Sequence, residues 1–170
     1  MTAETRQSKS LSRRSLLKGA AGAVSLARRI VRDLGARSFH VNTAKKALYH
    51  AAAVTSSGHM VALFDIATEM LGRCGLKEKD ARSVLMPLIE STVANLKELP
   101  PAEALTGTFA RADVETVHRH LKAIRQEKVK EALAAYTILG RRSLRLAERR
   151  GASREALEAI LKSLVEPDPE

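Results

Sequence analysis

The sequence is poor in aromatic residues and in the residue types that build strands. It has no Trp, two Tyr and three Phe among 170 residues. Runs of β-branched residues, which are typical of strands, are nearly absent. Leu, Ala, Val and Ile must therefore form the hydrophobic core, and Leu and Ala both have high helix propensity. The sequence predicts an all-α fold, and its length is that of one domain.

The sequence also has little that could bind a metal or a phosphate group. One cysteine, Cys74, cannot form an internal disulfide and offers no cluster of metal ligands. His118 and His120 are two positions apart on an expected helix, so they point apart and should not form a metal pair. Residues 19–22 (GAAG) lack the third glycine and the preceding strand of a dinucleotide-binding loop. We therefore expect neither a metal site nor a cofactor site in this chain.

The net charge of +10 is concentrated near the N-terminus. Residues 1–42 carry nine Lys and Arg against two acidic residues, whereas residues 43–170 carry 20 against 17. A nucleic-acid-binding domain would more often carry a basic stripe on its folded body, with aromatic side chains for stacking on bases. Neither feature is visible, so we expect no nucleic-acid partner.

A long segment with apolar or small residues on nearly every side covers residues 42–75. Asn42 or Thr43 can cap its start, and Gly75 can end it in a left-handed conformation. Such a helix is either a membrane span or the buried axis of a helical domain. Charged residues within it argue against a span: Lys45, Lys46, Asp65 and Glu69. We expect one long central helix inside a helical bundle, and no membrane partner.

The helical domain is expected over residues 42–165, and the starts and ends of its remaining helices can be predicted from proline and capping residues. A helix is predicted over 77–99, with Pro87 inside it expected to kink or split it. Asp113 should cap a helix that ends near residue 126, and the next helix should cover 128–150. Ser153 should cap the last helix.

The first 41 residues differ from the rest. Residues 1–23 form a basic leader that we expect to be disordered, and within it residues 12–18 (SRRSLLK) resemble a twin-arginine export signal. An amphipathic helix ending at Gly35 should follow, then a short strand over 37–41. Signal cleavage after Ala27 would cut that helix. We expect a cytoplasmic protein, with twin-arginine export as the alternative.

The candidate chemistry lies on the predicted central helix. Lys46, His50 and Ser57 project within roughly 40° of one another on a continuous helix, at 100° per residue. Lys46 could bind an anion and His50 could move a proton, while Tyr49 and Ser57 could add hydrogen bonds. The competing interpretation is that Lys46 is simply solvated and His50 is a helix histidine without a catalytic role.

Several blocks of sequence resemble the family called domain of unknown function 2520. The resemblance covers about residues 24–150, which is most of the chain, and its blocks include 26–39 (LARRIVRDLGARSF), 46–54 (KALYHAAAV), 57–63 (SGHMVAL) and 104–113 (ALTGTFARAD). In that family a Rossmann-like NAD(P)-binding domain precedes a helical domain. The helical domain is similar to the C-terminal domains of 6-phosphogluconate dehydrogenase, ketopantoate reductase and pyrroline-5-carboxylate reductase.

The resemblance implies roles for particular residues. In several of those relatives a Lys, followed four residues later by a polar residue, faces the nicotinamide, and Lys46 and His50 stand in that pattern. They are therefore the expected catalytic residues, with Tyr49 and Ser57 expected to bind substrate. Separately, we expect a homodimer, because the face of the central helix that a cofactor domain would cover is left uncovered, and such apolar patches tend to find partners.

This sequence also departs from the family. Gly107-Thr108 and Arg111-Ala112-Asp113 stand where Gly-Pro and Arg-Gly-Asp are expected. The Rossmann half is not recognisable, and residues 24–41 would be its remnant helix and strand. The implied function is a substrate-side and dimerisation domain of an NAD(P)-dependent oxidoreductase, inactive without its cofactor domain. The alternative is a non-catalytic helical dimerisation module, with or without export.

Overall fold

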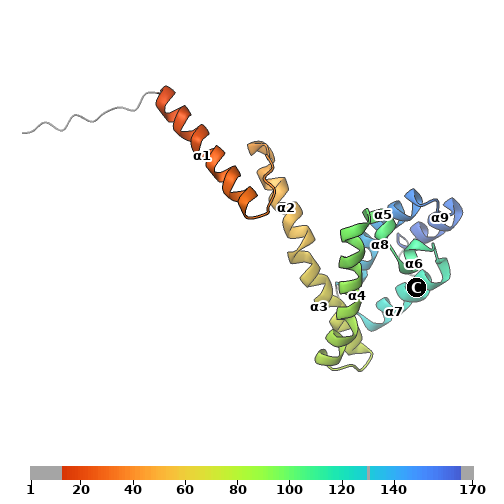
Figure 1. Cartoon of the computed structure of the whole chain (residues 1–170). Coiled ribbons are helices and arrows are strands. Elements are labelled where there is room, and N and C mark those ends of the chain that lie inside the picture. Colours follow the sequence, from red (N-terminus) through yellow and green to blue (C-terminus); the bar gives the residue numbers. More distant parts are fainter. Residues whose placement is uncertain (1–12, 130, 166–170) are drawn as a thin grey trace, which may run out of the picture. The chain divides into compact units, whose positions relative to one another are not determined.

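The computed structural model describes residues 13–129 and 131–165, with side chains from residue 21 onward (Figure 1). Across these residues the ordered elements are helices and no strand is present, which confirms the all-α prediction. No helix among them is both long and apolar enough to cross a membrane. The chain divides into two units, Met1–Ala51 and Ala52–Glu170, and each is described separately.

The helices follow one another in this order: α1 (Arg13–Asp33), the short 3-10 helix η1 (Thr43–Lys45), α2 (Lys46–Ser56), α3 (Gly58–Arg73), α4 (Glu78–Glu98), α5 (Pro101–Ala104), α6 (Gly107–Ala110), α7 (Val114–Glu127), α8 (Ala132–Arg149) and α9 (Arg154–Ser163).

In the first unit, α1 ends as expected at Gly35, which has φ +71°. The N–H of Ala36 donates to the carbonyl of Val31 at 2.9 Å and closes the helix end. The helix begins at Arg13, so it extends into the segment expected to be a disordered leader; residues 1–12 lie outside the described residues. The prediction of a strand over 37–41 is wrong. The described residues contain no other strand with which this segment could form backbone hydrogen bonds.

The predicted helix over 42–75 is two helices with a break at Ser57. Asn42 caps its start as expected, since its side-chain oxygen accepts from the N–H of Ala44 at 3.0 Å. At Ser57 the backbone leaves regular helical geometry, with φ −118° and ψ −69°. The hydroxyl of Ser56 donates to the carbonyl of Ala53 at 3.2 Å, and Gly58 has low helix propensity. The N–H of Ser57 still donates to the carbonyl of Ala53 at 3.1 Å, so the interruption is confined to one residue beside a glycine.

The expectation of a buried central axis is also wrong. Over their whole described length, α2 and α3 contain no buried residue. The core lies instead where α7, α8 and α9 meet, because each of these helices has an apolar stripe at helical spacing. It consists of Val117, Leu121, Leu144, Ala147, Leu157, Ile160 and Leu164.

A smaller cluster connects α3 to this core. Ile124, Val129 and Ala132 are buried, and Ile66 and Met70 of α3 pack against them. Helix α4 packs along α3 and runs unbroken through Pro87, so that proline does not split it.

The structure tests three further helix boundaries. Asp113 and Ser153 cap α7 and α9 as predicted. Helix α8 begins at Ala132 rather than at residue 128, because Lys128 adopts a left-handed conformation with φ +52° at the end of α7.

Candidate functional site

The predicted catalytic residues lie in the first turns of α2. Its start is set by the cap at Asn42 and by the N–H of Lys46, which donates to the carbonyl of Thr43. Lys46 and His50 are one turn apart, so their side chains are neighbours on the helix surface. Both are exposed, and neither side chain makes a hydrogen bond or ion pair with any residue that the structure describes. They are accessible to a ligand, but their catalytic role stays a prediction.

Tyr49 is held by an aromatic contact. Its ring meets that of Phe39 edge to face, with centroids 5.6 Å apart and planes at 60°. This pair attaches the segment before η1 to α2. Tyr49 is still 52% exposed, so its hydroxyl remains open to a substrate.

Ser57 lies at the break between α2 and α3. It occupies the N-cap position of α3, yet its side chain makes no capping hydrogen bond. The sequence argument that put Ser57 on the face of Lys46 and His50 assumed one continuous helix. Because the structure has two helices, that spacing argument no longer holds, and the binding role of Ser57 stays a prediction.

A second polar pair, missed by the sequence analysis, lies in the second unit. The hydroxyl of Tyr136 on α8 is 2.9 Å from Nδ1 of His120 on α7. The Tyr136 ring also contacts Phe109 of α6, with centroids 5.5 Å apart. Burial raises the pKa of Tyr136 to about 12, so the phenol stays protonated at neutral pH and can donate to His120. The sequence feature that could have pointed to this pair is a single tyrosine in the Ala-rich start of α8.

Tyr136 borders a small cavity of about 200 Å³ between α3 and α8. Nearly all of the cavity is lined by apolar side chains, including Leu63, Phe109 and Leu139, with Ser143 as a further polar residue. The arrangement can hold a small apolar group beside the hydroxyl-bearing residues Tyr136 and Ser143. None of its described lining side chains is charged.

The two histidines of α7 make separate contacts, as their spacing predicted. His118 forms a hydrogen bond through Nε2 with the hydroxyl of Ser163 on α9, whereas His120 contacts α8. Among the residues that the structure describes, no group of three or more His, Cys, Asp or Glu could hold a metal ion.

A groove between α3 and α4 in the second unit is lined almost entirely by apolar side chains. Its volume is about 270 Å³, and Thr92 is its one polar lining residue among the described side chains. Leu88 is 63% exposed, and Leu96 and Met60 are exposed as well. The lining residues are Met60, Leu63, Phe64, Ala67, Leu85, Leu88, Ile89, Thr92, Val93 and Leu96.

Comparison with known proteins gives one match. The family model described as domain of unknown function (DUF2520) matches residues 15–143. No curated protein matches the chain, and no solved structure does. The matched region covers most of residues 24–150 and begins earlier, inside the segment with the twin-arginine-like pattern. The chain therefore belongs to the DUF2520 family.

Proposed function

We propose that this chain is the self-associating, substrate-side helical domain of an NAD(P)-dependent oxidoreductase, and that it needs a separate nucleotide-binding domain for catalysis. The observation that carries the proposal is the apolar groove between α3 and α4. Membership of the DUF2520 family and the resemblance of its helical domain to that of 6-phosphogluconate dehydrogenase supply the enzymatic part.

Self-association follows from the exposure of this groove. Contiguous apolar surface on a soluble protein is unfavourable in water and usually marks an interaction site. A second copy brings the same two helices, so a two-fold interface can pair one groove with the other. Stable interfaces bury about 1,200–2,000 Å² in total, and the exposed residues of α3 and α4 would form the central part of such an area.

Sedimentation velocity at several concentrations tests this association. We expect the unmodified chain to form a dimer and Leu88→Glu to be a monomer, because the new charge would be buried in the interface. Ile138→Glu on α8 is the matched control. Ile138 is 67% exposed, close to the 63% of Leu88, but it lies outside the groove. A strictly monomeric unmodified chain would contradict the proposal, as would equal dissociation of both variants.

The substrate-side role rests on Lys46 and His50. Oxidation of a hydroxyl by hydride transfer also releases a proton, and a positioned Lys or His can hold or relay it. A nucleotide-binding domain would hold the nicotinamide, which accepts the hydride. The described residues contain no strand followed by a glycine-rich loop, so we assign no nucleotide site to them.

The cofactor part is tested by titrating NADPH and NADH into the chain and following nucleotide fluorescence. We expect no saturable binding at micromolar concentrations. Micromolar binding of either nucleotide would overturn the assignment.

The second candidate is a non-catalytic helical association module, which the same groove supports. It differs from the first in Lys46 and His50, which would have no substrate to contact. We propose a cytoplasmic location for either function; recovery of the chain outside the cytoplasm, shortened within α1, would instead support export through the twin-arginine-like segment.

A further inference from the structure

A second groove, distinct from the α3–α4 groove, lies between α8 and α9. Its volume is about 670 Å³, within the usual range of about 300–1,000 Å³ for small-molecule sites. One face of each helix lines it, because the lining positions recur every three or four residues. They are Arg141, Leu144, Arg145 and Glu148 from α8, and Arg154, Leu157, Glu158, Leu161 and Val165 from α9 and the residues after it.

The bottom of this groove is apolar. Leu144 and Leu157 are 6% and 9% exposed and belong to the main core. Leu161 and Val165 are 44% and 56% exposed, so they leave apolar surface along the α9 side. An apolar chain laid in the groove would remove this surface from water.

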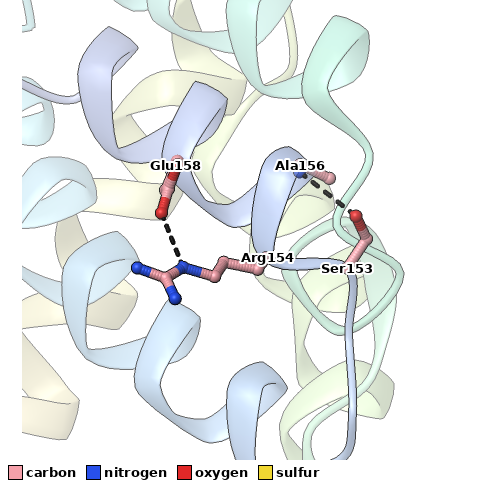
Figure 2. Close-up of polar contacts among 4 residues, drawn as sticks. All are labelled: Ser153, Arg154, Ala156 and Glu158. Atoms are coloured by element: carbon pink, nitrogen blue, oxygen red, sulfur yellow. Dashed lines mark hydrogen bonds and ion pairs between the residues drawn. The ribbon is translucent and has the colours of Figure 1, made fainter.

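The charges on the α9 side are already paired. Nε of Arg154 donates to a carboxylate oxygen of Glu158 at 2.8 Å, as Figure 2 shows. That hydrogen bond, followed by the charges of Glu158 and Glu148, raises the pKa of Arg154. The start of α9 is set by Ser153, whose hydroxyl accepts from the N–H of Ala156 at 3.4 Å (Figure 2). Glu158 therefore offsets part of the positive charge of Arg154.

Two arginines on the α8 side, Arg141 and Arg145, have no ion-pair partner among the described residues. Arg141 and Arg145 are one turn apart, and neither makes a hydrogen bond or ion pair with a residue that the structure describes. Two like charges at this spacing repel each other, and an anion between them would relieve that repulsion. A guanidinium can bind a carboxylate through two parallel hydrogen bonds.

We propose that the α8–α9 groove binds an amphiphilic carboxylate, with the carboxylate held by Arg141 and Arg145 and the apolar chain lying on Leu144, Leu157 and Leu161. The unpaired guanidinium groups select the charge of the head group, and the apolar floor selects the chain. Glu158, which is paired with Arg154, and Glu148 also line the groove, and an anion is repelled beside their carboxylates. The favourable position for the head group is therefore at Arg141 and Arg145.

The test is isothermal titration of decanoate below its micelle-forming concentration, with two companion probes. Acetate has the head group without the chain, and decyltrimethylammonium has the chain with the opposite charge. We expect saturable binding of one decanoate per chain and no saturable binding of either companion. Equal binding of the cationic probe, or no saturable binding of decanoate, would overturn the proposal.

Variants locate the site. Arg141→Gln and Arg145→Gln should each weaken decanoate binding by about tenfold or more, the effect expected for a charge-assisted hydrogen bond. Arg142→Gln is the matched control, because Arg142 is an exposed arginine on the same helix outside the groove. Equal weakening by Arg142→Gln would mean that general positive charge, and not this groove, attracts decanoate.

A last variant separates this site from the α3–α4 groove. Leu88→Glu should leave decanoate affinity unchanged, because Leu88 lines the other groove. If Leu88→Glu abolished binding while Arg145→Gln did not, the chain would occupy the α3–α4 groove and the proposal would be wrong. Circular dichroism confirms that each variant keeps its helical content.

Discussion

The hydroxyl of Tyr136 lies 2.9 Å from Nδ1 of His120, and this hydrogen bond joins α8 to α7 across 16 positions of sequence. Phe109 of α6 packs on the same tyrosine ring, so one half-buried side chain links three helices. The contact lies beside the smaller buried cluster, in which Tyr136 and residues of α3 take part. Tyr136 is therefore a residue through which the second unit can be probed.

The titration of Tyr136 should be displaced to high pH. Burial raises its pKa to about 12, whereas an unfolded tyrosine titrates near ~10. The folded state thus favours the neutral phenol, and its contribution to stability is complete below about pH 10 and lost as the pH rises toward 12. In a Tyr49→Phe variant, absorbance of the remaining phenol should report a midpoint near 12. A midpoint near ~10 in a chain that is still folded would contradict the buried position.

The hydrogen bond itself should be measurable by a double-mutant cycle. Tyr136→Phe and His120→Ala, alone and together, should give a coupling free energy of about 0.5–1.5 kcal/mol in urea unfolding, the usual net value for one hydrogen bond. Additive effects of the two substitutions would show that the contact does not contribute in solution. His118→Ala is a suitable control, since His118 bonds to Ser163 instead.

Gly140 should not accept even a methyl group. A Cβ there would lie 2.9 Å from Cζ of Phe109 and 3.2 Å from Cδ1 of Leu164. Alanine normally stabilises a helix interior relative to glycine by about 1 kcal/mol, but overpacking at this site should reverse the sign and destabilise by about 1–3 kcal/mol. Thermal and urea unfolding measure the difference.

Gly72→Ala provides the comparison. Gly72 is helical and a Cβ there would meet nothing within 4 Å, so alanine should be neutral or stabilising. Phe109→Leu combined with Gly140→Ala should recover part of the lost stability, because it removes the ring atoms that clash. Equal responses at Gly72 and Gly140 would contradict the close packing.

Asp113 should make stability depend on pH at the start of α7. Its carboxylate accepts from the N–H of Thr116 at 3.0 Å, and this backbone hydrogen bond is the main cause that lowers the pKa of Asp113. A lowered pKa gives stability that is present above the unfolded pKa near 3.8 and lost as the pH falls through the folded value. Asp113→Ala should lower the melting temperature at neutral pH but not at strongly acidic pH.

Asp113→Asn separates the cap from the charge. Asparagine also caps helices well, so this variant should keep most of the melting temperature at neutral pH and lose part of its acid dependence. A melting temperature that falls equally at both pH values for Asp113→Ala would mean that the charge is not involved.

Lys46 should matter for activity and not for stability. In a fusion of this chain to the nucleotide-binding domain that the proposed function requires, Lys46→Ala should lower kcat/KM strongly, and His50→Ala should also lower it and alter its pH profile. Lys45→Ala is the matched control, being the adjacent exposed lysine on η1. Equal activity of Lys45→Ala and Lys46→Ala would favour the non-catalytic association module.

Much of the fold was predictable because its signals are local. The caps at Asn42, Asp113 and Ser153 each bond to a backbone N–H two or three residues away, and Gly75 ends α3 through its own positive φ of 89°. Such contacts depend only on neighbours in the chain, so residue type and spacing reveal them. The Lys46–His50 pair on one helix was visible for the same reason.

Local sequence patterns gave wrong predictions for two segments. One prediction assumed an uninterrupted helix, and the other assumed a neighbouring strand. The apolar segment 42–75 favoured one helix, but the structure interrupts it at Ser57, next to Gly58. The segment 37–41 favoured a strand that has no described neighbour to pair with. Whether α2 and α3 are buried depends on which helices reach them, and sequence periodicity does not contain that information.

Residue types and their spacing thus determined that the chain is helical, where most helices end, and which family it resembles. Only the tertiary structure decided that the core lies at α7, α8 and α9, that Tyr136 meets His120, and that Arg141 and Arg145 line one groove with Leu161. These relationships join side chains on different helices. They depend on how whole helices pack, which minimises exposed apolar area over the entire unit and cannot be deduced from any one segment.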